Sequence, residues 1–340
     1  NRKNTDMLKI ICEHFGGVII LTSLAKEKKT VTAAQAKGMQ KLAINFKKYW
    51  QIYLLLIPAL VWYILFAYYP MAGLQLAFKT YKAKIGIWGS PWCGFQNFEA
   101  VFRDMYFWRS VGRTLLINVG RLIINFPAPI LVALMLNELR VGRYKKVMQT
   151  VFTFPHFLSW VIVASIMTNL LSIDGLVNGA LSAMGLQTIN FLGSETLFQP
   201  MLYITDIWKS AGYSSIIYLS AISGIDQDQY EAAEIDGATR WQRIWNVTLP
   251  NILPTISVLF IMTTGNLMTA GFDQIFNLSN AATKNVAEVL DIYIYRITFT
   301  ASTDFGFSTA VSLFRSIINM TLLVIANKGS KMMGGTGLFG

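Results

Sequence analysis

Charged residues are scarce in this sequence. Asp, Glu, Lys and Arg make up 14% of its 340 residues, against about 25% in an average soluble domain. Hydrophobic residues make up 54%, so the composition excludes an ordinary soluble enzyme and indicates an integral membrane protein. In so apolar a chain, the net charge of +11 is more typical of cytosolic loops and membrane edges than of a nucleic-acid-binding surface. We therefore expect membrane lipid and no nucleic acid among its partners.

Cysteine and histidine are scarce as well. Cys12 and Cys93 form no CxxC pair, and the topology below puts them on opposite sides of the membrane, so neither a disulfide nor a zinc site is predicted. His14 and His156 are too few and too scattered for a metal cluster. The sequence also lacks a Gly-x-x-x-x-Gly-Lys-Ser/Thr loop, because the late run Gly334–Gly337 has no lysine to reach a phosphate. We expect no enzymatic activity, no bound cofactor and no ATPase site in this chain.

Long apolar runs are what the sequence has instead. A membrane-crossing helix needs about 20 mostly apolar residues. Six stretches qualify: Tyr49–Tyr69, Val111–Asn137, Val147–Ile173, Leu197–Ile225, Val247–Phe272 and Gly306–Asn327. They predict an all-α membrane domain over residues 49–327, preceded by a basic segment, 1–48, and followed by a tail, 328–340. The apolar run Phe15–Ala25 is short for a span, which favours an interfacial helix over a signal-peptide core and leaves a short extra span open.

The distribution of Lys and Arg predicts the orientation. Residues 1–48 hold ten, the loop Glu138–Lys146 four, the segment Gly224–Asn251 two and the C-terminal tail two, which is 18 of the 29. The opposite loops and their edges hold eight, and three lie within spans. Because Lys and Arg accumulate in cytosolic loops, we expect both termini and Gly224–Asn251 to be cytosolic.

The segment Gly224–Asn251, between the fourth and fifth spans, has the pattern of a soluble helical hairpin. It carries five acids and two bases. Asp226 with Gln229, or Asp228 with Glu231, has the spacing of a capping box, and we expect the first helix to stop at Gly237. The second helix would place Trp241, Ile244, Trp245 and Thr248 on one face, until Leu249-Pro250 breaks the register. An acidic hairpin does not suit anionic lipid, so it is either a protein-docking surface or a solvated face.

The hairpin sequence resembles the signature of binding-protein-dependent ABC importer permeases. The matching residues are Glu231, Ala232, Ala233, Gly237, Val247, Leu249 and Pro250, with Asp236-Gly237-Ala238 as in the sugar branch. Val247 stands where isoleucine is commoner. Further segments are similar to the LplB/YtcP-type subgroup, which takes up complex saccharides and includes an alginate importer's first permease: Gly89–Phe98, Phe154–Ala164, Asp206–Asp226, Gly265–Phe276 and Thr309–Met320. The likeness covers roughly residues 45–340.

This resemblance implies a six-helix type I permease of the bacterial cytoplasmic membrane, working by alternating access. Its partners would be a second permease subunit, two ATP-binding subunits that carry ATP and Mg²⁺, an extracytoplasmic solute-binding protein and an oligosaccharide, acidic or neutral. The hairpin would be the coupling helix, docking to an ATPase through Glu231, Ala232, Ala233, Asp236, Gly237, Trp241, Leu249 and Pro250. Glu231 would make the charged contact, the two alanines the close approach and Gly237 the turn.

Polar residues at membrane depth are candidates for the substrate pathway, because each ionisable group there costs about 2.5–3.5 kcal/mol on insertion scales and needs a cavity or a partner. The candidates are Asn118, Arg121, Trp160, Asn169, Asp206, Lys209, Tyr213, Asn266, Asp273 and Arg315. The three-residue spacing of Asp206 and Lys209 favours an internal ion pair over direct ligand contact. Arg121, Arg315 and Asp273 are expected to face the bundle interior, where either arginine would meet Asp273 or an acidic sugar. For the uncharged candidates, helix packing is an equally good interpretation.

Breaks in the spans are also expected. Gly265-Asn266 and Pro254 are candidates for breaking the fifth span, and Phe154-Pro155-His156-Phe157 for a proline bend in the third. Two other classes of function fit the sequence less well. An ion-coupled secondary transporter would use the buried charges and usually shows inverted repeats, of which we find none convincing. A membrane-embedded enzyme would need clustered His, Ser or carboxylates, whereas those of the spans are dispersed.

Overall fold

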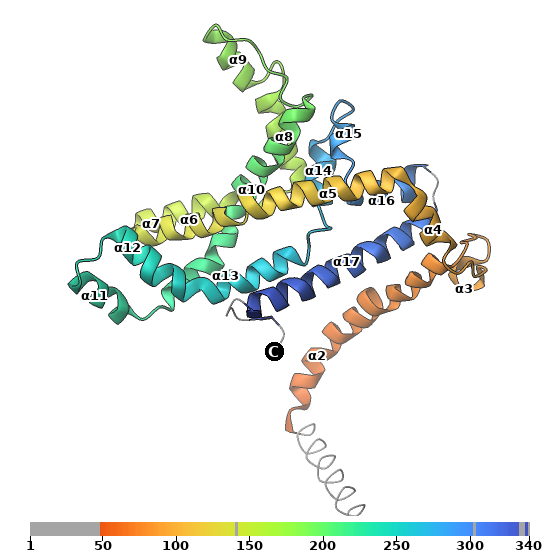
Figure 1. Cartoon of the computed structure of the whole chain (residues 1–340), viewed down its shortest axis with the longest axis horizontal. Coiled ribbons are helices and arrows are strands. Elements are labelled where there is room, and N and C mark those ends of the chain that lie inside the picture. Colours follow the sequence, from red (N-terminus) through yellow and green to blue (C-terminus); the bar gives the residue numbers. More distant parts are fainter. Residues whose placement is uncertain (1–47, 140–141, 302–303, 333–336, 339–340) are drawn as a thin grey trace, which may run out of the picture. The chain divides into compact units, whose positions relative to one another are not determined.

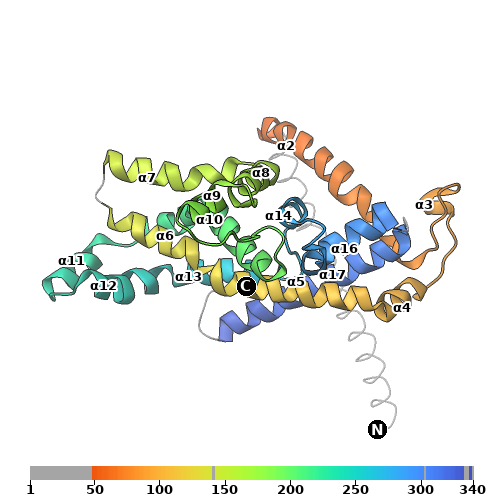
Figure 2. The same cartoon turned by 90° about the horizontal axis from the view of Figure 1, so that it is seen from above.

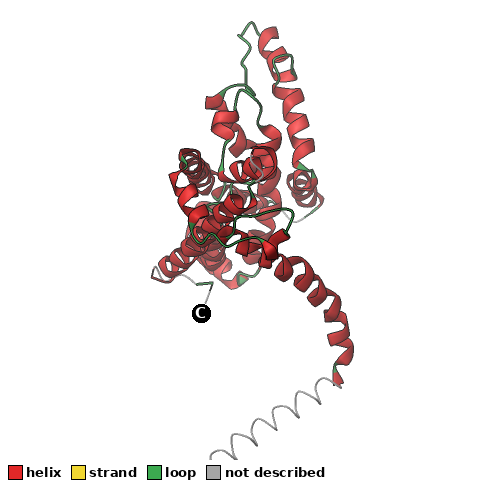
Figure 3. Ribbon diagram, turned by 90° about the vertical axis from the view of Figure 1, so that its right-hand side faces the viewer, coloured by secondary structure: helices red, strands yellow, loops and turns green. Residues whose placement is uncertain are grey.

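The computed structural model describes residues 48–139, 142–301, 304–332 and 337–338 (Figure 1). These ranges contain helices and no strand, apart from an isolated antiparallel bridge between Lys79 and Trp92 (Figure 3). The predicted all-α fold is thereby confirmed. The run Phe15–Ala25 lies outside the described residues. The chain divides into two units, residues 1–73 and 74–340.

In the first unit, the described residues form one apolar helix. α2 (Trp50–Tyr63) continues as a π-helical turn, Ile64–Tyr68, and then as a 3-10 helix that starts at Tyr69 and ends at Phe78 in the second unit. None of the residues of α2 is buried within the chain. A helix that is apolar all round suits a hydrocarbon environment, as expected for the first predicted span.

The second unit holds the remaining helices. Before the hairpin these are α3 (Gly86–Gly89), α4 (Gln96–Arg103), α5 (Met105–Ile124), α6 (Pro127–Glu138), α7 (Arg143–Thr153), α8 (Trp160–Leu171), α9 (Leu176–Ala183) and α10 (Glu195–Ser223). The hairpin and the C-terminal part comprise α11 (Gln227–Ile235), α12 (Arg240–Arg243), α13 (Leu249–Thr264), α14 (Phe272–Leu278), α15 (Lys284–Ala287), α16 (Leu290–Arg296) and α17 (Phe305–Met332). Three buried apolar clusters hold the unit together, centred on Leu202, Tyr293 and Ile222.

Two of the predicted spans are broken by proline. The second consists of α5 and α6, which meet at Asn125-Phe126, directly before Pro127. The third consists of α7 and α8, separated by the 3-10 turn Phe154–Phe157 and by Leu158, whose backbone is extended. The proline bend predicted there is confirmed. Proline lacks the backbone N–H that an uninterrupted helix needs, while Phe126 and Phe154, the residues before the two prolines, keep helical backbone angles.

Five helical stretches of the described residues are long and apolar enough to cross a membrane: Trp50–Phe78, Met105–Glu138, Trp160–Ala183, Arg240–Thr264 and Phe305–Met332. Four of them overlap most of a predicted span, whereas Trp160–Ala183 consists of α8 and α9 and shares only residues 160–173 with the predicted span Val147–Ile173. The remaining predicted span is α10, whose 29 residues extend about 44 Å at 1.5 Å per residue. α10 is more polar because protein surrounds much of it: it packs against α5, α6, α7 and α13, and twelve of its residues are buried.

The fifth span ends early. α13 runs through Pro254 without interruption and stops at Gly265, and residues 265–271 then lead to α14. Asn118 holds this connection, donating from its side-chain amide to the carbonyls of Leu267 at 2.7 Å and Thr269 at 3.1 Å. The expected break is therefore present at Gly265-Asn266 and absent at Pro254.

The hairpin lies at one end of the second unit. Figures 1 and 2 show α5 and α6 following one another along the unit, with α11 and α12 at the end where α6 connects to α7. The base of the hairpin packs there, because Tyr230, Val247 and Leu249 contact the buried cluster that includes Leu136 of α6 and Ile222 of α10. This agrees with the prediction that the hairpin and the loop Glu138–Lys146 share one side of the membrane.

Candidate functional site

The turn of the hairpin is built on Gly237. Asp226 caps α11 by accepting a hydrogen bond from the N–H of Asp228 at 3.1 Å. At the other end, Gly237 has φ +75°, a left-handed conformation that glycine adopts without a steric penalty. Its N–H bonds to the carbonyl of Glu234, and the N–H of Ala238 bonds to that of Ala233. This is the Schellman arrangement, and it confirms the predicted stop at Gly237.

Polar contacts brace the two arms of the hairpin. Thr239 and Gln242 form a capping box at the start of α12, the second helix of the hairpin, for which no capping pair was predicted. Arg243 reaches back to Glu234, with 3.2 Å between guanidinium and carboxylate. The hydroxyls of Tyr230 and Thr248 lie 2.9 Å apart, and Asn251 donates to Gln229 at 2.8 Å. The hairpin therefore has a defined shape of its own.

The second arm continues into the fifth span, which begins at Leu249 as expected, and the register changes in the turn just before it. Residues Ile244–Thr248 form a π-helical turn, and Pro250 lies in the first turn of α13. A π turn has i→i+5 hydrogen bonds, so it shifts the register without ending the helix. The arm and the span thus form one helical stretch, Arg240–Thr264, and a force on the hairpin would act directly on α13.

The outward surface of the hairpin is unusually exposed. No residue of α11 is buried, and Glu231, Ala232, Asp236 and Gly237 are exposed while Ala233 is half-buried. Three large apolar side chains are also exposed: Ile235 at 87%, Trp241 at 72% and Trp245 at 66%. Thr248, expected on the same face as the tryptophans, is buried instead. Leu249 is half-buried at the base, and Pro250 is exposed.

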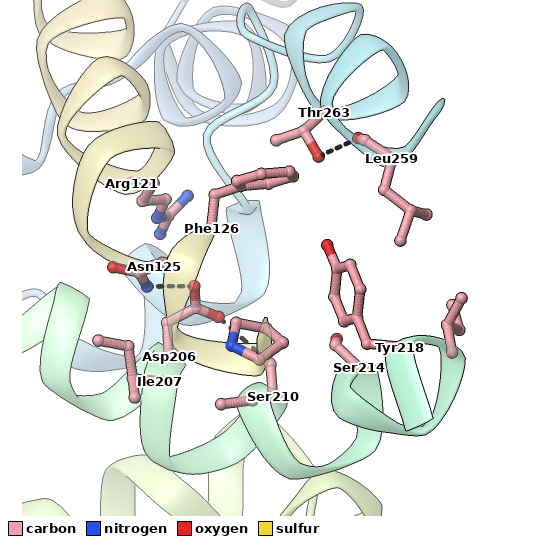
Figure 4. Close-up of a pocket in the computed structure, with 13 residues that line it drawn as sticks. Arg121, Asn125, Phe126, Asp206, Ile207, Ser210, Ser214, Tyr218, Leu259 and Thr263 are labelled. Atoms are coloured by element: carbon pink, nitrogen blue, oxygen red, sulfur yellow. Dashed lines mark hydrogen bonds between the residues drawn. The ribbon is translucent and has the colours of Figure 1, made fainter. Parts of the chain in front are cut away.

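A second site is a cavity of about 280 Å³ between α5, α6, α10 and α13. Figure 4 shows Arg121, Asn125 and Asp206 on one side of it and Tyr218, Leu259 and Thr263 on the other. Asn125 donates to the carboxylate of Asp206 at 2.6 Å. Nε of Arg121 and Oδ1 of Asn125 are buried without a hydrogen-bond partner. The amide of Asn125, the guanidinium of Arg121 and the carboxylate of Asp206 thus lie together in a cavity that is also lined by the hydroxyl-bearing side chains of Ser210, Ser214, Tyr218 and Thr263.

Arg121 also fixes the backbone after α13. Its guanidinium donates to the carbonyl of Ala270, to the side chain of Asn118 at 3.2 Å, and to the side-chain carbonyl of Gln274. The expected contact with Asp273 is absent, because Asp273 is exposed and its neighbour Gln274 is the buried partner. Arg121 therefore connects the cavity to the irregular segment 265–271.

Asp206 and Lys209 do not pair with each other, contrary to the expected ion pair. The ammonium of Lys209 donates to the backbone carbonyl of His156 at 2.6 Å and lies 5.5 Å from the ring centre of Trp160. The carboxylate of Asp206 instead accepts hydrogen bonds from the side chains of Asn125 and Ser210. The break between α7 and α8 exposes a carbonyl to Lys209, a partner that helix spacing alone does not reveal.

The remaining pathway candidates are dispersed. Tyr213 stacks on His156 with ring centres 3.9 Å apart, so it belongs with Lys209 and Trp160. Arg315 pairs with Asp291 of α16 rather than with Asp273. Asn169 and Asn266 are exposed, and Asn266 donates to the carbonyl of Met262, one turn earlier in α13. Of the ten candidates, the structure places Arg121 and Asp206 together in the cavity, with Asn118 in contact with Arg121.

The sequence patterns above do not single out two important residues, Asn125 and Gln274. Asn125 had a usable signal: it lies one turn after Arg121 in an apolar run and directly before Phe126-Pro127, where a helix break frees polar backbone groups. Gln274 had none, because its role depends on a contact with Arg121 across 153 positions of the chain.

Comparison with known proteins identifies the family. Residues 125–326 match the family of binding-protein-dependent transport system inner membrane components. The chain belongs to this family. It is therefore a multi-pass permease of the cytoplasmic membrane that works with a binding protein, and the comparisons give no support to an ion-coupled secondary transporter. The resemblance found in the hairpin sequence is confirmed over 59% of the chain by this match alone.

Individual relatives extend the match to nearly the whole chain. Protein LplB of Bacillus subtilis (strain 168) is 38% identical over 94% of this chain and 100% of its own length. The polygalacturonan/rhamnogalacturonan transport system permease protein YteP of the same organism is 39% identical over 88% of this chain and 94% of its own. A solved structure of a bacterial alginate ABC transporter in complex with an alginate pentasaccharide-bound periplasmic protein contains a chain 38% identical to this one. It covers 86% of this chain and 98% of that one, with a TM-score of 0.78.

Proposed function

We propose that the chain is one of two different permease subunits of an ABC importer for an acidic oligosaccharide. An extracytoplasmic solute-binding protein delivers the sugar. Two ATPase subunits, which carry the ATP and Mg²⁺, close on each other and move the segment Gly224–Asn251, so that the bundle opens alternately to either side. The observation that carries the proposal is the hairpin, a braced and outward-facing elbow that is continuous with a membrane span.

The chemistry of the hairpin favours a protein partner over lipid or water. Burial of a large apolar side chain is worth about 1.5–3 kcal/mol, and Ile235, Trp241 and Trp245 all have most of their surface available for it. The acidic residues around them disfavour the anionic inner leaflet. Ala232 and Ala233 leave room for close approach, and the exposed carboxylate of Glu231 offers a charged contact.

The acidic sugar is inferred from relatives and from the cavity. One relative is a polygalacturonan/rhamnogalacturonan permease, and a structural relative belongs to a transporter involved in the import of the acidic polysaccharide alginate. In this chain, Arg121 offers a cation to the cavity, and its unpaired Nε lies there with the unpaired Oδ1 of Asn125. A sugar hydroxyl both donates and accepts a hydrogen bond, so it complements these two atoms.

The test of the docking role is co-purification of the assembled complex. Trp241→Ala should lose most of the ATPase subunit, because the exposed indole ring is an anchor of the kind that dominates protein interfaces. Trp88→Ala is the matched control: Trp88 is also 72% exposed but lies in α3, outside the hairpin, and its replacement should leave the ATPase bound. Equal ATPase recovery with the two variants would refute docking through this surface.

The test of the substrate is uptake by the complex reconstituted with its binding protein in liposomes. Trigalacturonate should be imported and should stimulate ATP hydrolysis, while maltotriose, a neutral trimer, should do neither. Import of maltotriose alone would overturn the acidic-sugar assignment. Uptake that persists without the ATPase and collapses with a protonophore would overturn the ABC mechanism itself.

A further inference from the structure

A basic cleft of about 260 Å³ lies at the far end of the second unit from the hairpin. It is lined by four cations, Arg109 and Arg113 of α5, Lys284 of α15 and Arg296 of α16, together with Tyr106 and Asn285. Arg109 and Arg113 are near the start of the stretch Met105–Glu138, whose other end packs against the hairpin base. The distribution of Lys and Arg therefore predicts that the cleft faces the outside.

The charge of this cleft is only partly balanced. Glu288 is the one acid that lines it, and Arg296 already holds its carboxylate with both Nε and Nη2 at 2.7 Å. Arg109, Arg113 and Lys284 make no ion pair or side-chain hydrogen bond with the described residues. Three cations thus converge on one concavity whose single lining carboxylate, Glu288, is already bound by Arg296. Like charges brought together in this way repel each other, so an anionic ligand would stabilise the arrangement.

Two hydrogen bonds between α16 and α5 hold the basic cleft in shape. The phenol of Tyr293 in α16 donates to the carboxylate of Asp104 at the start of α5, at 2.5 Å. Burial and this hydrogen bond raise the pKa of Tyr293 above its usual value. One turn of helix earlier, the N–H of Leu290 donates to the hydroxyl of Thr114 at 2.8 Å. These bonds fix α16 against α5, so Arg296 stays opposite the two arginines of α5.

An aromatic cleft adjoins the basic one. It measures about 350 Å³ and shares Lys284, Glu288 and Arg296 with the basic cleft. Phe276 and Tyr295 line it, with ring centres 5.2 Å apart. Phe272 packs against both of these rings, with ring centres 5.0 Å from Phe276 and 5.3 Å from Tyr295, and Phe299 lies 5.5 Å from Tyr295. Flat apolar faces beside hydrogen-bonding and cationic groups are the chemistry that recognises a charged sugar chain, because the faces of its rings are apolar and their edges are polar.

We propose that the two adjoining clefts form an entry site in which Arg109, Arg113 and Lys284 bind carboxylate groups of the oligosaccharide while Phe276 and Tyr295 receive its sugar rings. This proposal rests on the proposed function and adds the residues that select acidic over neutral sugars. A concave shape of this size suits one or two sugar units rather than the broad surface that a docked protein covers. Arginine suits the task because its planar fork binds a carboxylate with two parallel hydrogen bonds.

The experiment uses the complete complex in liposomes, with trigalacturonate and its methyl ester, which has the same rings without the charge. The binding protein is loaded with either one. Arg109→Gln, Arg113→Gln and Lys284→Gln should each raise the KM for trigalacturonate about tenfold, as expected for a lost charged contact of ordinary strength, and leave uptake of the ester unchanged. Arg113→Lys keeps the positive charge and should therefore raise the KM for trigalacturonate less than Arg113→Gln does. Raising the salt concentration should weaken uptake of the acid more than that of the ester.

Arg103→Gln is the matched control, because Arg103 is an exposed arginine of α4, paired with Glu99 and outside the cleft. It should change neither KM. Assembly of each variant with its partners, measured by size-exclusion chromatography, monitors folding.

Three outcomes would contradict the proposal. An unchanged KM for trigalacturonate in all three Gln variants would show that the cations do not contact the sugar. An equal loss for acid and ester would mean that the cleft receives an acidic surface of the binding protein instead. If the unaltered complex imports neither sugar, the proposed function fails as well, which the first two outcomes leave intact.

Discussion

The ammonium group of Lys209 in α10 donates a hydrogen bond to the backbone carbonyl of His156 at 2.6 Å. His156 lies in the break between α7 and α8, where Pro155 removes a backbone donor and Leu158 is extended. A carbonyl left unpaired at membrane depth is costly because no water is available to it. The lysine therefore satisfies the broken helix, and Trp160 covers its charge.

We expect Lys209→Met to destabilise the protein by about 1.5–3 kcal/mol, the usual contribution of a hydrogen bond to a charged group. Thermal unfolding in detergent measures this. Lys209→Arg should recover part of the loss. Lys328→Met provides a matched change at an exposed lysine of α17 and should have little effect. Equal unfolding temperatures for the variants at positions 209 and 328 would show that the bond to His156 contributes nothing.

Gly212 permits the close contact between α10 and α7. A methyl group at this position would overlap the backbone carbonyl of Phe152, so the two helices would have to separate. We expect Gly212→Ala to destabilise the protein by about 1–3 kcal/mol, as overpacking of a core does. In contrast, Gly329→Ala in α17 meets nothing within 4 Å and should be neutral or stabilising, because alanine favours a helix by about 1 kcal/mol over glycine.

The left-handed conformation of Gly237 can be tested separately from crowding, because a Cβ atom added there would meet nothing within 4 Å. Gly237→Val should strain the turn by about 1–3 kcal/mol and reduce both ATPase co-purification and uptake. Gly237→Asn should be tolerated better, since asparagine enters this region of backbone space more readily. Indistinguishable results for the two variants would exclude the turn as the cause.

The ion pair between Arg315 of α17 and Asp291 of α16 joins the last span to the irregular segment before α14. Asp291 also accepts a hydrogen bond from the N–H of Ala270 at 2.8 Å, and its side chain is 9% exposed. Arg315→Met should cost about 2 kcal/mol or more, because it leaves a buried carboxylate without its cation. The double variant with Asp291→Asn should be more stable than Arg315→Met alone. Additive losses in this double-mutant cycle would mean that the two side chains do not interact.

Much of the fold followed from local patterns. The apolar runs predicted the spans, since a helix must satisfy its own backbone in lipid and needs a fixed length to cross it. Gly237 predicted the turn of the hairpin, because only a few residue types take its conformation. A criterion of apolarity alone would not identify α10 as a span, because α10 is surrounded by protein and can carry more polar residues than a helix that faces lipid.

The partners of the charged side chains could not be predicted from the sequence. The spacing of Asp206 and Lys209 favoured an ion pair within one helix, yet each side chain finds its partner on another element, Asn125 and His156 respectively. Likewise, Arg121 contacts Gln274 rather than Asp273, because only one of these neighbours faces inward.

The sequence by itself determined that this is a helical membrane permease of a recognisable family, with a hairpin shaped by a single glycine. These properties depend on short-range rules of helix length, capping and solvation. Only the tertiary structure decided which polar groups share a cavity, and that Arg109 and Arg113 converge with Lys284 and Arg296 on one cleft. Those groups lie far apart in the sequence, as Asn125 and Asp206 do at a separation of 81 residues, and packing, rather than local sequence, brings them within reach.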